Sequence, residues 1–287
     1  HLREAQARLR LNSKIGTAKR EFLVPWLGFA HELSVSHNTP NTILPRLRTV
    51  ENDFVSLNLN SSGVEALTLP QLTSVGGDFR VGAPGNGSGE FRKLNIPRLK
   101  TVGGDFIASF SWHFFEAQNW PSLERADNFV VVGGAEATVD RLKEVTGLFT
   151  YTLRTNLNDQ KAKISFASLE AIRGKLTIQV PGTNTERITV EEINFPKLTF
   201  TESIDLDSDD NPMELVKMPA LLNTNYIIAD ANSLTLDQLQ SAQFIRIWAS
   251  EESIHYMPEV TQIDDLVIIE GRVTLIQEIN LPKIENK

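Results

Sequence analysis

A pattern of apolar and polar residues built around proline recurs along most of the chain. Apolar residues lie six, three and one positions before the proline and two positions after it, as in Val64, Leu67, Leu69 and Leu72 around Pro70. The copies are marked by Pro45, Pro70, Pro97, Pro121, Pro196, Pro219, Pro258 and Pro282. A repeat of this length is typical of solenoids, in which each repeat packs on its neighbours.

The short apolar runs alternate with polar residues, which predicts β-strands that bury one face. A second strand is expected after each copy, at residues 78–81, 128–132, 175–180, 226–229, 244–248 and 266–269. Degenerate copies at residues 139–142, 166–169 and 236–239 fill the longer gaps. We therefore predict a mainly β fold, a single-domain right-handed β-solenoid of about eleven coils over residues 44–287.

Stacked coils place equivalent residues about 4.8 Å apart, so identical positions form ladders. One inward ladder is predicted to contain Phe54, Phe79, Phe106, Phe129, Phe149, Leu176 and Ile204. The glycine pairs Gly76-Gly77 and Gly103-Gly104 are expected to supply corners with positive φ, a conformation that glycine adopts at little cost.

Residues 1–43 precede the regular repeat. Residues 2–11 combine helix formers with apolar residues at helical spacing, and residues 25–29 add an apolar plug. We expect residues 1–43 to form an N-terminal helical cap over the first coil of the solenoid, because open strand edges promote aggregation. The chain ends in the middle of a copy, so we expect it to be a fragment of a longer protein.

The clearest copies are LPQLTSVGGDF at residues 69–79 and IPRLKTVGGDF at residues 96–106. They resemble the leucine-rich coils of receptor L domains, the ligand-binding solenoids of insulin- and epidermal-growth-factor-type receptors. Similar coils occur in fungal cell-wall glycoproteins and bacterial surface proteins. The resemblance covers roughly residues 44–287 and implies ligand recognition at a cell surface or in a secreted protein. Eukaryotic L domains usually carry disulfides at their ends, and the absence of cysteine here favours a bacterial surface protein.

Composition excludes several classes of function. The chain has no cysteine, which removes disulfides and thiolate metal sites. The net charge is −8, and residues 151–287 carry 12 basic and 21 acidic side chains. Nucleic-acid binding needs a clustered basic face, so we expect no nucleic-acid partner. No run of 18 apolar residues occurs, so we expect no transmembrane segment in this chain.

Catalytic motifs are scarce. The five histidines have no metal-ligand spacing, and the glycine-rich residues 82–89 lack the lysine of a phosphate-binding loop. We expect no cofactor. The alternative is calcium at Asp205, Asp207 and Asp209, whose alternating carboxylates resemble the start of an EF-hand loop without its glycine and closing glutamate.

Three groups of residues are candidates for ligand binding. A polar row two positions before the proline includes Asn95 and Asn119, and a row one position after it includes Arg46, Arg98 and Arg141. The aromatic run at Phe110, Trp112 and His113 falls in a connection between strands, where repeat proteins carry binding features.

The sequence therefore predicts a non-catalytic recognition module, secreted or at the cell surface, that binds a protein or polysaccharide along an exposed face. Two alternatives stay open. The first is a carbohydrate-active β-helix enzyme, a lyase or hydrolase that uses clustered carboxylates. The second is a structural spacer within a larger surface protein.

Overall fold

The computed structural model describes residues 4–13, 21–37, 41–58, 66–82, 92–110, 118–134, 137–153, 160–180, 188–208, 213–248, 254–269 and 278–280. Within these ranges there are strands and turns but no helix, and thus no apolar helix long enough to cross a membrane. Parallel strands stack on one another as a β-solenoid. The predicted β class and solenoid are confirmed, whereas the right-handed winding stays a prediction.

The chain divides into two compact units. Unit 1 comprises His1–Leu142 with Arg154–Asn156, and unit 2 comprises Lys143–Leu153 with Leu157–Lys287. In each unit the chain alternates between two rows of parallel strands, here called the first face and the second face, with turns between them. Side chains that point between the two rows form the core of the unit.

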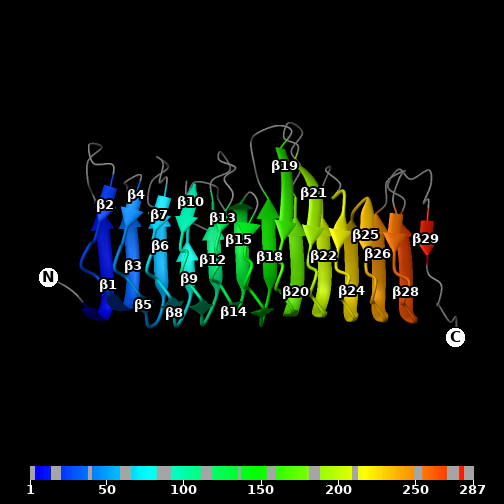
Figure 1. Cartoon of the computed structure of the whole chain (residues 1–287), viewed down its shortest axis with the longest axis horizontal. Helices are drawn as coiled ribbons and strands as arrows, with labels where there is room; N and C mark the ends of the chain where they lie inside the picture. The colour runs from blue at the N-terminus through cyan, green and yellow to red at the C-terminus, as the bar shows by residue number, and fades with distance from the viewer. Residues whose placement is uncertain are drawn as a thin grey trace. The chain divides into compact units, whose positions relative to one another are not determined.

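Unit 1 carries its strands in blue to green in Figure 1. The long strands of its first face are β1 (Glu4–Ser13), β3 (Phe29–His37), β6 (Phe54–Asn58), β9 (Phe79–Val81), β12 (Phe106–Ser109) and β15 (Phe129–Gly134). Short strands precede four of them: β5 (Thr49–Val50), β8 (Ser74–Val75), β11 (Thr101–Val102) and β14 (Arg125–Ala126). The second face contains β2 (Glu21–Leu23), β4 (Asn41–Ile43), β7 (Ala66–Thr68) and β10 (Lys93–Asn95), followed by β13 (Gln118–Asn119) and β16 (Ala137–Thr138).

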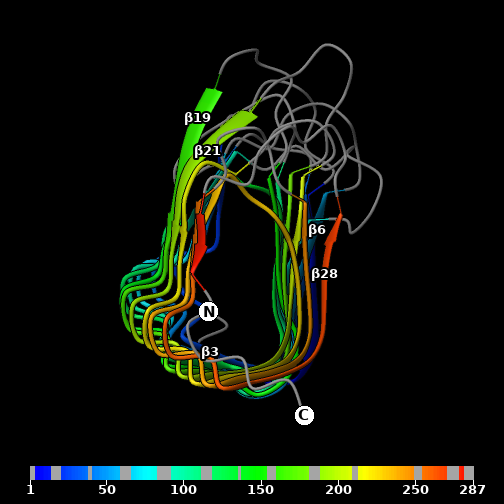
Figure 2. The same cartoon turned by 90° about the vertical axis from the view of Figure 1, so that its right-hand side faces the viewer.

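Unit 2 repeats this arrangement. Its first face contains β17 (Glu144–Val145), β18 (Phe149–Leu153), β20 (Ala171–Gln179), β22 (Phe200–Asp207), β24 (Asn223–Asp230), β26 (Ser241–Trp248) and β28 (Gln262–Ile269). The second face contains β19 (Gln160–Ser165), β21 (Ile188–Asn194), β23 (Val216–Lys217), β25 (Ser233–Thr235), β27 (Ile254–Tyr256) and β29 (Glu278–Asn280). Figure 2 shows β21 and β28 on opposite sides of the coil.

The predicted helical cap is wrong. Residues Glu4–Ser13 form β1, which pairs in parallel with β3, and β2 pairs with β4 on the second face. The reason is visible at residues 8–11, where arginine and leucine alternate with period two: Leu9 lies opposite Leu33, and Arg8 forms an ion pair with Glu32 at 2.9 Å. The count of about eleven coils from residue 44 is not supported either, because strand stacking begins upstream of that residue.

The predicted phenylalanine ladder forms the core of unit 1. Phe54, Phe79, Phe106 and Phe129 occupy equivalent positions on neighbouring strands, and all four are fully buried. Their ring centroids are 5.0, 5.4 and 5.3 Å apart, and the planes of successive rings differ by 12° or less. Each such pair contributes about 0.5–1.5 kcal/mol beyond the burial of area. Within unit 2, Phe149, Leu176 and Ile204 are likewise aligned with one another in register.

The glycine pairs of unit 1 have a different role from the predicted one. Gly82 and Gly133 have positive φ, whereas no such angle occurs at Gly103 or Gly104. A Cβ on Gly103 would overlap the carbonyl oxygen of Gly76 in the preceding coil, and a Cβ on Gly104 would overlap Oδ1 of Asp78. The prediction of positive φ is therefore wrong: the pairs allow close approach of two backbones.

We expect Gly103→Ala to lower the free energy of unfolding by about 1–3 kcal/mol, because the neighbouring backbone must move to admit the methyl group. Urea unfolding followed by circular dichroism measures the change. Lys100→Ala, an exposed substitution in the same coil, is the control and should change stability by less than about 0.5 kcal/mol. Equal stability of Gly103→Ala and the wild type would show that the backbones are not tightly apposed.

One histidine lies in the core of unit 2. His255 is 2% exposed, and β27 places it in register between Leu234 of β25 and Ile279 of β29. Neither ring nitrogen has a hydrogen-bond partner among the described residues. Burial lowers the pKa of His255 to about 4, because an apolar environment disfavours the charged imidazolium.

This histidine should make unit 2 less stable in acid. Below pH of about 6.5 the unfolded chain binds a proton that the folded chain excludes until pH of about 4. The free energy of unfolding should therefore fall as pH decreases through this window, by at most about 1.4 kcal/mol per pH unit. Urea unfolding at several pH values should give a shallower dependence for His255→Leu. Tyr256→Phe, an exposed substitution on the same strand that changes no histidine or carboxyl group, should keep the wild-type dependence. An unchanged slope in His255→Leu would refute the assignment.

Candidate functional site

The turn around the proline of each copy places one side chain on the outside of unit 1. The Leu72 N–H donates to the Leu69 carbonyl at 3.2 Å, and the Leu99 N–H donates to the Ile96 carbonyl at 3.2 Å. These are the closing bonds of β-turns with proline at the second position. The next residue lies at the outer corner of the coil. These residues, the corner row, are Trp26, Arg46, Gln71, Arg98, Ser122 and Arg141.

Neighbours in the corner row contact one another. The guanidinium carbon of Arg46 lies 5.9 Å from the ring centroid of Trp26, a cation–π geometry. Arg98 Nη1 donates to Gln71 Oε1 at 2.6 Å. The predicted candidates Arg46 and Arg98 are thus exposed members of one row, and Arg141 is exposed at the equivalent corner. Trp26, which is 51% exposed, was assigned to the helical cap although Pro25 fits the repeat.

A groove lies beside the N-terminal part of the corner row. Its volume is about 970 Å³, and it is lined by Glu4, Trp26, Gly28, Phe29, Pro45, Arg46, Arg48 and Gln71. Arg48 is aligned with Gly28 by a backbone bond of 2.9 Å between the Arg48 N–H and the Gly28 carbonyl.

The charge of this region is positive. The row that contains Arg48 continues through Thr73 to Lys100, since each N–H donates to the carbonyl of the preceding coil at 2.8–2.9 Å. Among the residues that the structure describes, Arg46, Arg48, Arg98 and Lys100 form no ion pair with a carboxylate. Their charges are therefore available to an anionic ligand. In the next coil the position equivalent to Lys100 is Glu124, so the run of cations ends there.

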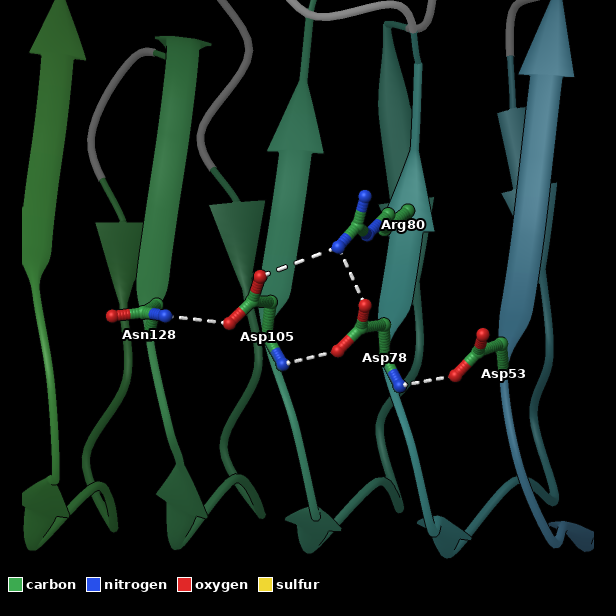
Figure 3. Close-up of polar contacts among 5 residues, drawn as sticks. All are labelled: Asp53, Asp78, Arg80, Asp105 and Asn128. Carbon is green, nitrogen blue, oxygen red and sulfur yellow. Dashed lines mark hydrogen bonds and ion pairs between the residues drawn. The ribbon is translucent and has the colours of Figure 1, made fainter.

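A second polar row in unit 1 consists of Asp53, Asp78, Asp105 and Asn128 at equivalent places in four coils (Figure 3). Oδ1 of Asp53 accepts from the Asp78 N–H at 2.9 Å, and Oδ1 of Asp78 accepts from the Asp105 N–H at 2.9 Å. Asn128 Nδ2 donates to Oδ1 of Asp105 at 2.6 Å. Each carboxylate therefore links its own coil to the next one.

Arg80 neutralises part of this row. Its Nη2 lies 2.5 Å from Oδ2 of Asp78 and 3.4 Å from Oδ2 of Asp105 (Figure 3). Both oxygens of Asp78 thus have a partner within the fold. A general acid or base must exchange a proton with substrate, which needs a carboxyl group within reach of it. The aligned aspartates are better explained as supports of the coil stack.

The polar row on the second face is only partly exposed. Asn95 is half-buried beside Thr68, whereas Asn119 is exposed beside Thr138. Trp112 and His113 lie outside the described residues. Phe110 is 4% exposed and stacks on Trp120 with centroids 6.2 Å apart, so it belongs to the core and not to a binding surface.

The structure does not bring the predicted calcium ligands together in a site that it describes. Lys175 Nζ lies 2.5 Å from Oδ2 of Asp205, which neutralises that carboxylate, and Asp207 is exposed on the same face of β22. Asp209 lies outside the described residues. Within the described ranges no group of histidine, aspartate and glutamate side chains suits a metal ion.

The sequence analysis missed a set of aromatic side chains on the first face of unit 2. Tyr226, Phe244, Arg246 and Trp248 alternate with the buried Ile227, Ile245 and Ile247, and therefore point outward. Asp230, also on this face, accepts from Ser208 Oγ at 2.8 Å, and burial raises the pKa of its carboxyl. The period-two spacing that predicted these strands also predicts which of their side chains point outward, so the sequence could have identified this set.

A scan against protein-family models and searches of curated proteins and of solved structures found no match to this chain.

Proposed function

We propose that the chain is a non-catalytic recognition module, secreted or at a cell surface, that binds an acidic polysaccharide along the corner row of unit 1. One observation carries the proposal: Arg46 and Arg48 line a groove beside the exposed ring of Trp26, and neither arginine is paired with a carboxylate among the described residues. A cell-surface location agrees with the resemblance to receptor L domains.

The chemistry of the groove suits a charged sugar. A guanidinium group binds a carboxylate or sulfate through two parallel hydrogen bonds, which fixes the orientation of the anion. The indole of Trp26 offers a flat apolar face on which the C–H groups of a pyranose ring can pack. A ligand that carries both features in one unit, such as a uronic acid or a sulfated sugar, would contact both the guanidinium groups and the indole.

The spacing of the corner row suits a polymer. Arg46 and Arg98 are separated by the coil that carries Gln71, so their backbones are about 9.6 Å apart, twice the spacing of stacked coils. An extended chain with regularly placed anionic groups can therefore meet successive cations without bending. Gln71, bound to Arg98, supplies an amide between them that can donate to sugar hydroxyls.

We favour a catalytic function less than ligand binding. The aligned carboxylates of unit 1 are occupied by backbone N–H groups and by Arg80. An acidic patch on a protein would satisfy the cations but would not need the exposed indole. We therefore place a polysaccharide ahead of a protein as the ligand of this row.

The double variant Arg46→Ala/Arg48→Ala should bind polygalacturonate or dextran sulfate about 10- to 100-fold more weakly than the wild type, which corresponds to about 1.4–2.8 kcal/mol. Isothermal titration calorimetry at two salt concentrations measures the affinity, and the salt dependence should also decrease. Arg46→Lys/Arg48→Lys should retain the salt dependence but lose part of the affinity, because an ammonium group cannot form the paired bonds.

Arg173→Ala is the matched control, because Arg173 is an exposed cation of unit 2 that is already paired with Glu144 at 2.8 Å. It should bind both polymers like the wild type. Release of reducing ends from any polymer would support the enzyme instead. Equal binding by Arg46→Ala/Arg48→Ala and the wild type would contradict the assignment of the site, and absence of binding to both polymers would favour an acidic protein ligand or a structural spacer.

A further inference from the structure

We propose that the first face of unit 2 carries a separate site for the pyranose rings of a neutral polysaccharide, formed by Tyr226, Phe244, Arg246 and Trp248. This site does not depend on the corner row. It lies on strands β24 and β26, which are adjacent, parallel and in register.

The outward side chains of the two strands form a compact surface. Tyr226 is aligned with Phe244, Ile228 with Arg246, and Asp230 with Trp248. Tyr226 is 47% exposed, and its ring centroid lies 6.4 Å from that of Phe244. On the preceding strand, β22, Ser203 is aligned with Tyr226 and Asp205 with Ile228, whereas the exposed Phe200 lies at the start of the strand and is aligned with Asn223. On the following strand, β28, the residues aligned with Phe244, Arg246 and Trp248 are Asp265, Val267 and Ile269. At these register positions the aromatic residues are therefore confined to β24 and β26.

Arg246 is held in place by these rings. Its guanidinium carbon lies 5.3 Å from the centroid of Phe244 and 5.8 Å from that of Trp248. Within the described residues the side chain forms no hydrogen bond or ion pair, and its Nε is buried without a partner. A buried donor without a partner destabilises the fold, so packing alone does not account for this residue. Its terminal nitrogens keep donors for the hydroxyl oxygens of a ligand.

The acidic groups nearby decide between a neutral and an anionic ligand. Asp230 is aligned with Trp248. On the adjacent strand β22, Asp207 directly follows Leu206, which is aligned with Ala229, so the two aspartates lie on neighbouring strands. Lys175, on β20 two strands away from β24, is already paired with Asp205 of β22. Asp207 and Asp230 together outweigh the single positive charge of Arg246, so a ligand that carries carboxylates is disfavoured here, whereas sugar hydroxyls can donate to Asp230 and accept from Arg246. Apolar ring faces flanked by one donor and one acceptor group match a neutral pyranose.

Titration with laminarin, cellohexaose, chitohexaose and mannan tests the proposal. At least one of these neutral glycans should bind with a Kd below about 1 mM. Tyr226→Ala/Trp248→Ala should weaken that binding about tenfold or more, and Tyr226→Phe/Trp248→Tyr should largely preserve it because the flat rings remain. Arg246→Ala should weaken binding more than Arg246→Gln, which keeps a donor.

Tyr256→Ala is the matched control, because Tyr256 is 45% exposed on the second face of the same unit. It should bind like the wild type, as should Arg46→Ala/Arg48→Ala, so failure of this proposal is separate from failure of the acidic-polysaccharide site. Circular dichroism confirms that each variant is folded. The proposal is overturned if none of the four glycans binds, if Tyr226→Ala/Trp248→Ala binds as well as the wild type, or if that variant instead abolishes a self-association measured by sedimentation.

Discussion

Backbone hydrogen bonds between successive coils are the constraint on which the rest of this structure depends. In unit 1 the N–H groups of Gly76 and Gly103 donate to the carbonyls of Val50 and Val75, each at 2.9 Å. These bonds fix the distance between coils and bring equivalent side chains into rows. Because equivalent side chains of successive coils lie next to one another, the same geometry produces an apolar ladder inside the coil and polar rows outside it. It also forbids a Cβ where two backbones approach most closely, as at Gly103.

The rows also determine which charges the fold tolerates. Two like charges one coil apart repel by about 0.9 kcal/mol in water before salt screening, and by about 0.4 kcal/mol two coils apart. In the corner row Gln71 separates Arg46 from Arg98, which halves that repulsion. In the aspartate row the repulsion between neighbouring carboxylates is reduced in another way, because backbone N–H groups and Arg80 offset the negative charge. The first row keeps cations available for a ligand, and the second does not keep its carboxylates free.

The features that depend only on the spacing of residues within the repeat could be predicted from the sequence. Period-two alternation located the strands, and the position of Phe79 and Phe106 relative to proline predicted their stacking. The helical cap was wrong because the composition of residues 2–11 suits a helix, while stacking on β3 selects the alternation of Leu9 and Leu11 instead. The role of Gly103 required knowledge of the neighbouring coil, which spacing alone does not supply. Arg46 and Arg98 were identified as a row, but the groove with Trp26 depends on a coil that precedes the clear copies.

Among the described residues of unit 2, His255 and Arg246 bury nitrogen atoms that have no hydrogen-bond partner, and the surroundings of the two side chains differ. His255 lies between Leu234 and Ile279 inside the coil, where no ligand can reach it, so its unpaired nitrogens only reduce stability and make it dependent on pH. Arg246 is on the outer face between two aromatic rings, and only its Nε is enclosed. A missing hydrogen bond therefore only destabilises the core at His255, whereas at Arg246 it belongs to a surface that a ligand can reach. Position relative to the coil, and not the identity of the unpaired atom, separates a defect of the core from a candidate binding site.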